Sequence, residues 1–357
     1  MRAPLAHAAA IGLLVALLAG ILVACGSAPI GSQAATPIAR PSVAGSSSPP
    51  STTSSTSPSA SMPPVATGGR WVDAAPAPSR RAEFAAAVLD GRLYVAGGFD
   101  ALHPGEDLDT VDVYDPAPER WSSVASLPTG GRDHPGLVAL GGYLYFVGGE
   151  AGAHLVRDVL RYDPGADRWT PVAPLPAPRA QYAAVALASR IYVVGGVSTV
   201  AGAGRETWAY DPAADRWITG LAPIPTERNH LAAVAFEGRV WAIGGRVGSN
   251  LATVESYDPA SDTWRTEPPL ALPQGALTAA VVDGRIHVVG GEDLDTFQAL
   301  KVHQVFDPTT RAWLRGPDLP RPRHGLASGV VDGRWIVVGG GPVADYSATS
   351  RVDVFEP

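Results

Sequence analysis

One set of landmarks recurs six times in this chain of 357 residues and constrains the fold more than any other feature. Each copy has a Gly-Gly pair at the end of an apolar run, and the first glycines stand at positions 97, 148, 195, 244, 290 and 339. Four copies continue with Tyr-Asp-Pro, from Tyr114, Tyr162, Tyr210 and Tyr257. The last two copies have related motifs at this position, Phe306-Asp307-Pro308 and Phe355-Glu356-Pro357. In five copies a Trp follows seven residues later, as Trp121, Trp169, Trp217, Trp264 and Trp313. The spacing of 46 to 51 residues predicts a repeat architecture.

Each copy contains short apolar segments and no long helical pattern, which is typical of a propeller blade rather than of a helical solenoid. The double Gly, the Tyr-Asp-Pro and the Trp together resemble the kelch repeat over residues 70–357. The resemblance implies an all-β, six-bladed kelch-type β-propeller with four antiparallel strands per blade. Kelch propellers include both enzymes and binding modules, so the resemblance implies the fold and leaves the function open.

The two ends of the repeat region predict how the ring closes. The sixth copy stops at Pro357 before it reaches its Trp, whereas Trp71 stands ahead of the first copy in a segment, RWVDAAPAP, that matches RWSSVASLP of copy one. We expect the strand around Trp71 to complete blade six, which would remove an open edge strand.

Most of the repeated residues are expected to be structural. Small side chains, as in AAAVLD and TAAVVD, indicate the innermost strand of each blade, where the strands crowd around the axis. One register of the next strand should fill the space between blades and is occupied by Tyr94, Tyr145, Tyr192, Trp241, His287 and Ile336. His287 is therefore interpreted as a packing substitute. The Gly-Gly pairs should accommodate a positive φ or a close neighbour.

The amino terminus predicts export. Residues 1–25 read as a signal peptide, with a long apolar run that ends in Leu22-Val23-Ala24-Cys25 and resembles a bacterial lipobox. Cys25 is the only cysteine, so no disulfide can form within the chain, and we expect acylation of its thiol. The alternative is an uncleaved signal anchor. Both interpretations place the protein outside the cytoplasm, and the first anchors it to the outer side of the cytoplasmic membrane or cell envelope.

Residues 26–69 form a segment rich in Ser, Thr, Pro and Ala that lacks the apolar content to build a core, so we expect a disordered tether. The propeller at 70–357 holds 25 basic and 34 acidic residues, a net charge of −9, because residues 1–69 contain two basic and no acidic residues. This charge disfavours nucleic acid as a partner. We expect a monomer.

Function is predicted on the face that carries the variable loops between the second and third strands. An Arg stands sixteen residues before five of the six Gly-Gly pairs, namely Arg81, Arg132, Arg179, Arg228 and Arg323, and Gln274 replaces the sixth. In kelch repeats this Arg commonly bonds neighbouring backbone. The other interpretation is a rim of arginines that faces an anionic ligand.

Two residues after each Arg comes a position whose side chains do not repeat: Glu83, His134, Gln181, His230, Ala276 and Gly325. A purely structural register would repeat its residue type, as the Trp and Gly-Gly positions do. The four polar residues of this register, Glu83, His134, Gln181 and His230, are therefore our candidate binding site at the mouth of the central channel.

We predict no metal and no cofactor. A galactose-oxidase-like copper centre needs a Cys–Tyr crosslink, and the propeller has no cysteine. His134, His230 and His324 occur in alternate copies, but His324 is one residue out of register and is expected to point away.

Two classes of function remain open. The first is a membrane-tethered module that binds a protein or a glycan through its loop-bearing face. The second is a sugar-modifying enzyme that resembles the periplasmic sialic acid mutarotases, in which Glu83 with His134 or His230 would transfer protons. The sequence leans towards binding because it contains no phosphate-binding loop, no hydrolase motif and no other catalytic constellation.

Overall fold

The computed structural model describes residues 68–103, 105–198 and 204–357. The predictions for residues 1–67, including the signal peptide, Cys25 and most of the tether, lie outside these ranges. Among the described residues, no helix has the length and the apolar character needed to span a bilayer.

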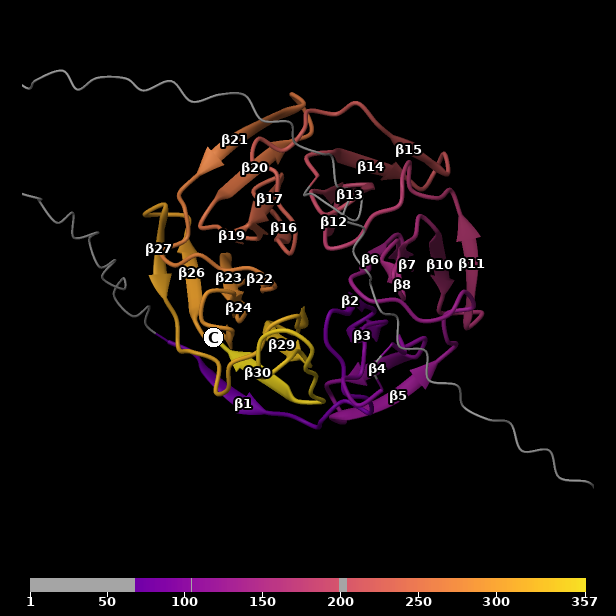
Figure 1. Cartoon of the computed structure of the whole chain (residues 1–357), viewed down its shortest axis with the longest axis horizontal. Coiled ribbons are helices and arrows are strands. Elements are labelled where there is room, and N and C mark those ends of the chain that lie inside the picture. Colours follow the sequence, from indigo (N-terminus) through magenta and orange to yellow (C-terminus); the bar gives the residue numbers. More distant parts are fainter. Residues whose placement is uncertain (1–67, 104, 199–203) are drawn as a thin grey trace, which may run out of the picture. The chain divides into compact units, whose positions relative to one another are not determined.

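Six four-stranded antiparallel sheets form a ring, as predicted, and each sheet is one blade (Figure 1). All six blades contribute lining residues to a cavity at the centre of this ring, which marks the central channel. The strands of blade one are β2 (Ala85–Leu89), β3 (Arg92–Ala96), β4 (Val111–Asp115) and β5 (Arg120–Val124). Those of blade two are β6 (Gly136–Leu140), β7 (Tyr143–Val147), β10 (Val159–Asp163) and β11 (Arg168–Val172). Those of blade three are β12 (Ala183–Leu187), β13 (Arg190–Val194), β14 (Thr207–Asp211) and β15 (Arg216–Ile218).

The remaining blades repeat this order from the channel outwards. Blade four contains β16 (Ala232–Phe236), β17 (Arg239–Ile243), β20 (Val254–Asp258) and β21 (Thr263–Glu267). Blade five contains β22 (Thr278–Val282), β23 (Arg285–Val289), β26 (His303–Asp307) and β27 (Ala312–Arg315). Blade six contains β28 (Ala327–Val331), β29 (Arg334–Val338), β30 (Val352–Glu356) and, as its outermost strand, β1 (Arg70–Asp73).

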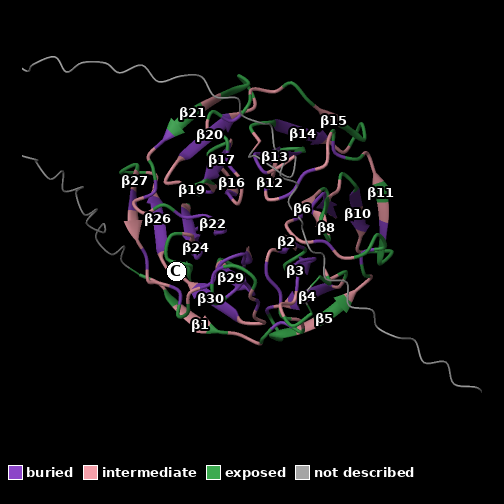
Figure 2. Cartoon of the chain, in the orientation of Figure 1, coloured by how far each residue is buried: buried purple, intermediate pink, exposed green. Residues whose placement is uncertain are grey.

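Short hairpins project from three of the loops between the second and third strands. They are β8 (Glu150–Ala151) with β9 (His154–Leu155), β18 (Arg246–Val247) with β19 (Ser249–Asn250), and β24 (Glu292–Asp293) with β25 (Gln298–Ala299). The two middle strands of every blade are mostly buried, the innermost strands mix buried and half-buried residues, and the outermost strands are more exposed (Figure 2).

The ring closes through β1, as the orphan Trp71 predicted. Strand β1 pairs with β30, and Trp71 lies opposite Phe355 in this pairing. Its indole packs on Phe355 with ring centroids 5.2 Å apart, as Trp121 packs on Tyr114 in blade one at 5.1 Å. The Trp71 indole N–H also donates to the Pro317 carbonyl oxygen at 2.7 Å, a bond to the preceding blade that Trp121 makes to Ala75. Trp71 therefore has the contacts of the Trp that the sixth copy lacks.

The prediction for this closure is that Trp71→Ala lowers the free energy of unfolding by about 3 kcal/mol, because it removes the packing on Phe355 and leaves the Pro317 carbonyl without its donor. Urea denaturation followed by circular dichroism measures this change. Trp71→Phe keeps an aromatic ring and should cost about 1 kcal/mol. A loss below about 0.5 kcal/mol for Trp71→Ala would show that β1 contributes little to ring closure.

Neighbouring blades join through backbone at the Gly-Gly pairs. Gly97 shows why glycine is required: its φ is +73°, and a Cβ there would lie 2.6 Å from the Arg132 carbonyl oxygen of the next blade. The N–H of Gly98 donates to that same oxygen at 2.7 Å. The equivalent bond recurs at the other five junctions, from Gly149, Gly196, Gly245, Gly291 and Gly340. The expected positive φ is confirmed, and the close neighbour is a backbone carbonyl.

The aromatic register of the second strand fills the space between blades, as predicted. Tyr94 of blade one packs against Tyr162 of blade two with centroids 6.2 Å apart, and His287 of blade five packs against Phe355 of blade six at 5.4 Å. His287 thus serves as the packing substitute that its register predicted. Its Nδ1 lies 2.9 Å from Nε2 of His303, and both imidazoles are buried.

Burial lowers the pKa of both histidines. The pKa of His287 falls to about 3 because of burial and the nearby His303 and Arg285. The pKa of His303 falls to about 4 because of burial, although the Pro317 carbonyl and the Asp318 carboxylate oppose the decrease. Both imidazoles are therefore neutral in the folded protein at pH values at which the unfolded chain is protonated.

This difference predicts that the propeller loses stability on acidification. The unfolded state binds the extra protons below its ordinary pKa of 6.5, so the stability is fully present above that pH and decreases as the pH falls towards about 4. Each histidine accounts for up to about 1.4 kcal/mol per pH unit. Urea denaturation between pH 7.5 and 4.5 measures the slope. His287→Tyr, the residue found at this register in three blades, should reduce it, and an unchanged slope would contradict the assignment.

Candidate functional site at the channel mouth

The non-repeating register forms a closed ring of backbone hydrogen bonds around the channel. In each blade the N–H of this residue donates to the carbonyl oxygen of the equivalent residue in the preceding blade, over 2.7 to 3.3 Å. All six residues have a left-handed backbone with φ between +48° and +57°. The members of this mouth ring are Glu83, His134, Gln181, His230, Ala276 and Gly325. The register is therefore structural in its backbone, whereas its side chains are free to differ.

Gly325, one of the two small members of the mouth ring, makes room for a larger one. A Cβ on Gly325 would lie 2.5 Å from Oε1 of Glu83, so the absence of a side chain there leaves space for the Glu83 carboxylate. The residue that follows each ring member is apolar or aromatic. These residues, Phe84, Pro135, Tyr182, Leu231, Leu277 and Leu326, line a smaller cavity of about 110 Å³ that the mouth ring also lines.

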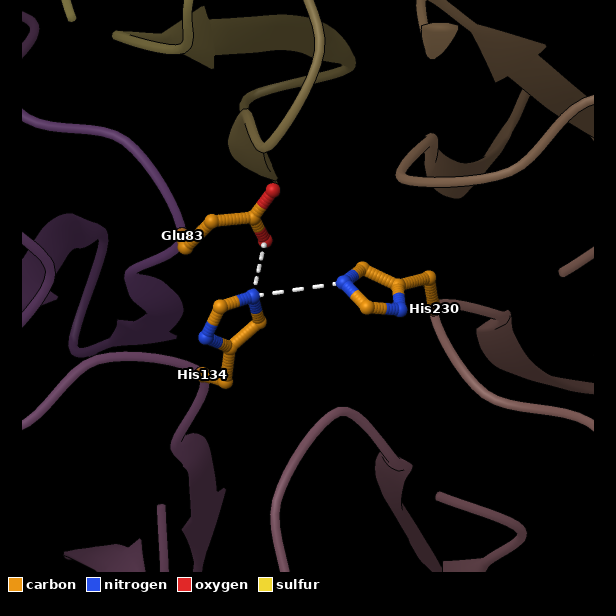
Figure 3. Close-up of side chains that lie close together, drawn as sticks. All are labelled: Glu83, His134 and His230. Carbon is orange, nitrogen blue, oxygen red and sulfur yellow. Dashed lines mark hydrogen bonds and ion pairs between the residues drawn. The ribbon is translucent and has the colours of Figure 1, made fainter. Parts of the chain in front are cut away.

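Three side chains of the mouth ring meet at its centre (Figure 3). Nε2 of His134 lies 3.4 Å from Oε2 of Glu83 and 3.3 Å from Nε2 of His230. Each of these residues stands two positions before the innermost strand of its blade, in blades one, two and four respectively. The sequence placed all three in one register, and the structure brings their functional atoms together.

The residue before each histidine fixes the orientation of its ring. Nδ1 of His134 lies 3.1 Å from Oδ1 of Asp133, and Nδ1 of His230 lies 2.7 Å from Oδ1 of Asn229. An N–H at each Nδ1 satisfies these oxygens and leaves both Nε2 atoms directed into the channel. At His230 Nε2 is then an acceptor, and Nη2 of Arg246 reaches it at 3.0 Å.

The surroundings separate the pKa values of the two histidines. Burial acts to lower the pKa of His134, but the carboxylates of Glu83 and Asp133 outweigh it and raise the pKa to about 9. At His230 burial lowers the pKa well below its ordinary value, and the positive charges of His134 and Arg246 add to this effect. At neutral pH the site therefore holds an imidazolium beside a neutral imidazole.

Apart from Gln181, the sequence analysis did not assign the polar residues that surround this pair to the site. Nε2 of Gln181 donates to Oε1 of Glu150 at 3.0 Å, and Arg246 forms an ion pair with Glu292 of the next blade. His324 also faces the site, because its Nε2 lies 3.8 Å from Oε2 of Glu292 and its ring lines the mouth cavity. The expectation that His324 points away was wrong: Nδ1 of His324 lies 3.1 Å from the Gly341 carbonyl oxygen, and this contact orients the ring.

These residues line a cavity of about 460 Å³ at the channel mouth, here called the mouth cavity. Glu83, His134, Gln181 and His230 all contribute to it, together with aromatic residues from the loops. Phe99 and Tyr346 stack face to face with centroids 4.3 Å apart, and Tyr346 is 44% exposed. Phe297 is 68% exposed and has a φ of +54°, which is strained for a bulky side chain. The mouth cavity thus combines two kinds of lining. We call its charged and polar side chains, Glu83, His134, Gln181, His230, Arg246 and Glu292, the charged floor, and its aromatic side chains, Phe99, Phe297 and Tyr346, the aromatic wall.

The five arginines do not form a ligand-facing rim. Arg81, Arg132, Arg179, Arg228 and Arg323 are at most 1% exposed. Each guanidinium bonds a backbone carbonyl in its own blade, as Arg179 does to Gly195 at 2.6 Å, and each pairs with a carboxylate. Of the two interpretations, the structure supports the one in which these arginines bond the backbone, because all five side chains are buried inside the blades.

The burial of the partner carboxylate predicts which arginine matters most for stability. Arg228→Ala leaves Glu255, 3% exposed, as an unpaired buried charge and should cost about 3 to 5 kcal/mol. Arg179→Ala leaves Glu206, 48% exposed, which water can solvate, and should cost clearly less. Urea denaturation of the two variants in parallel tests this ranking. Equal losses would contradict the idea that the stranded carboxylate dominates the cost.

The repeated junctions, the ring closure through β1 and the buried arginines define a kelch-type propeller whose mouth holds a polar cavity. Residues 66–196 match the KLHDC2/KLHL20/DRC7 Kelch-repeats domain, and residues 178–220 and 227–271 match the Kelch motif. The chain belongs to the kelch-repeat β-propeller family.

Individual relatives match only short parts of the chain. Kelch-like protein 23 of Homo sapiens is 36% identical over 64 residues, which is 18% of this chain and 11% of the relative. Kelch-like protein 34 of Homo sapiens is 34% identical over 82 residues, or 23% of this chain and 12% of the relative. The chain thus spans about a tenth of the length of these relatives. The solved structure of YjhT is similar in fold, with a TM-score of 0.67 and 16% identity over 78% of this chain and 95% of YjhT.

Proposed function

We propose that this protein is an extracytoplasmic binding module that takes a sugar ring, as part of a glycan or glycosylated partner, into the mouth cavity. The observation that carries the proposal is the pairing of an aromatic wall with a charged floor in one cavity of about 460 Å³. A sugar presents apolar C–H faces and polar hydroxyl groups, so it is suited to both surfaces at once. A cavity with a few convergent polar groups is the usual form of a small-ligand site.

The floor supplies both hydrogen-bond donors and acceptors to such a ligand. The carboxylates of Glu83 and Glu292 accept from hydroxyl groups, whereas Arg246 and Gln181 donate to hydroxyl oxygens. The exposed rings of Tyr346 and Phe297 would pack against the apolar face of the sugar. The strained backbone of Phe297 supports this role, because such strain at an exposed aromatic residue is retained where the side chain serves a ligand.

The proposal places the propeller outside the cytoplasm, on a tether that starts at an acylated Cys25 and ends near residue 69. Loss of membrane attachment in Cys25→Ala would support this arrangement, and unchanged attachment would contradict it. A partner exposed on a cell surface or a secreted glycan would be within reach of a propeller anchored in this way.

The binding experiment is a glycan screen of the full chain, followed by titration calorimetry on each sugar that binds. Tyr346→Ala should weaken binding about fivefold, since an aromatic contact contributes on the order of 1 kcal/mol. Leu102→Ala is the matched control: Leu102 is 61% exposed and lies outside the mouth cavity, so its loss should leave the affinity unchanged. Equal affinities for Tyr346→Ala and the parent chain would contradict the aromatic wall as a ligand surface.

A second candidate function, sugar mutarotation, is favoured by the His134–His230 pair. Anomer exchange requires a base that takes the proton of the anomeric hydroxyl and an acid that protonates the ring oxygen, so that the ring C–O bond breaks and an open-chain carbonyl forms. Re-addition of the hydroxyl formed from the ring oxygen to either face of this carbonyl, with return of the protons, restores the ring. The neutral Nε2 of His230 and the carboxylate of Glu83 are candidate bases, and the imidazolium of His134 is a candidate acid. Measurement of anomer exchange by NMR on a bound sugar separates the two functions: acceleration supports the enzyme, and binding without acceleration supports the module.

A further inference from the structure

Three metal-ligand atoms converge at the centre of the mouth ring. Oε2 of Glu83 and Nε2 of His230 lie 3.4 and 3.3 Å from Nε2 of His134. All three residues can offer atoms within 4.8 Å of one another. Two ligands at about 2.0–2.1 Å from a tetrahedral zinc ion lie roughly 3.3–3.4 Å apart. The two separations from His134 therefore match those between ligands of a tetrahedral metal ion, and the three side chains point toward one another (Figure 3).

The surrounding contacts already fix the tautomer and the orientation of the two imidazoles in the way that metal coordination requires. Asp133 bonds Nδ1 of His134, and Asn229 bonds Nδ1 of His230. Partners of this kind fix the tautomer of a ligating histidine and direct its Nε2 at the metal. In both cases the partner is the residue immediately before the histidine, so the same short backbone segment positions ligand and partner together.

The charge of the mouth cavity also favours a cation. The carboxylates of Glu83, Asp133, Glu292 and Asp345 line it, against the one guanidinium of Arg246. A second possible ligand group, made of Asp133, His134 and Glu150, shares His134 with the first. The first group is the better candidate, because Asp133 is already engaged with Nδ1 and serves there as the outer partner.

Although the sequence predicted no metal, we propose that Glu83, His134 and His230 bind one divalent transition-metal ion of the zinc class, which displaces the Nε2 proton of His134 to solvent. Two imidazoles and one carboxylate select such ions over calcium and magnesium, which prefer oxygen ligands. Three protein ligands leave one coordination position open, as in catalytic zinc sites, and all three ligands line the mouth cavity. The guanidinium of Arg246 turns away from His230 when the metal binds and keeps its ion pair with Glu292. The metal site stands independently of sugar binding.

The experiment titrates the full chain with zinc after chelator treatment, without a polyhistidine tag and with Cys25→Ser in every sample so that the single thiol cannot ligate. Calorimetry should show one zinc ion per chain, and cobalt should give the intense visible absorption of a tetrahedral site. Glu83→Gln and His230→Ala should each weaken zinc binding at least about 100-fold. Asp133→Asn, which alters only the outer partner, should weaken it about 10- to 100-fold.

His154→Ala is the control for adventitious binding, because His154 is exposed on the β8–β9 hairpin and lies outside the mouth cavity. It should leave zinc affinity unchanged. Alanine is compatible with the left-handed backbone at position 230, since Ala276 occupies the equivalent position with a φ of +55°. Absence of saturable zinc binding by the parent chain, or equal binding by the parent and His230→Ala, would overturn the proposal.

Discussion

Each blade junction depends on backbone hydrogen bonds that close the ring, and the rest of the molecule follows from them. One bond joins the second glycine of a Gly-Gly pair to the carbonyl of the Arg position in the next blade. Another joins successive members of the mouth ring, two residues further along the chain. Because neither bond uses a side chain, six blades with different sequences can meet in the same way. The bond to the carbonyl of the Arg position requires glycine in the blade that donates it, because a Cβ would collide with that carbonyl. This requirement explains why the Gly-Gly pair is the most regular feature of the repeat.

The same arrangement separates scaffold from function at single residues. The backbone of His134 belongs to the mouth ring, while its imidazole belongs to the polar cluster at the centre of the channel. The buried arginines show the opposite case, in which the side chain is part of the scaffold. Where Gln274 replaces the Arg in blade five, Gln304 replaces the carboxylate partner, so a neutral amide pair occupies the place of the ion pair. Exchange of both partners avoids an unpaired buried charge.

The fold could be predicted from the sequence because local landmarks encode it. The Gly-Gly pairs, the Trp residues and the orphan Trp71 each act through contacts that repeat in every blade. The ring positions of Glu83, His134, Gln181 and His230 could also be predicted, since register alone aligned them. Contacts between side chains of different blades could not be predicted from the sequence. The ion pair of Arg246 with Glu292 and the position of His324 depend on loop conformations that the repeat does not determine. The aromatic wall was missed for the same reason, because Phe99 and Tyr346 come from loops of different length.

The central claim is that the histidines of the mouth ring serve a ligand with their side chains and the scaffold with their backbone. The most direct test measures two quantities on the double variant His134→Ala/His230→Ala: the free energy of unfolding, and the affinity for a ligand that binds the parent chain. We predict that stability changes by no more than about 1 kcal/mol, because the backbone bonds persist, while ligand binding is lost. A loss of several kcal/mol in stability with unchanged ligand affinity would contradict the claim.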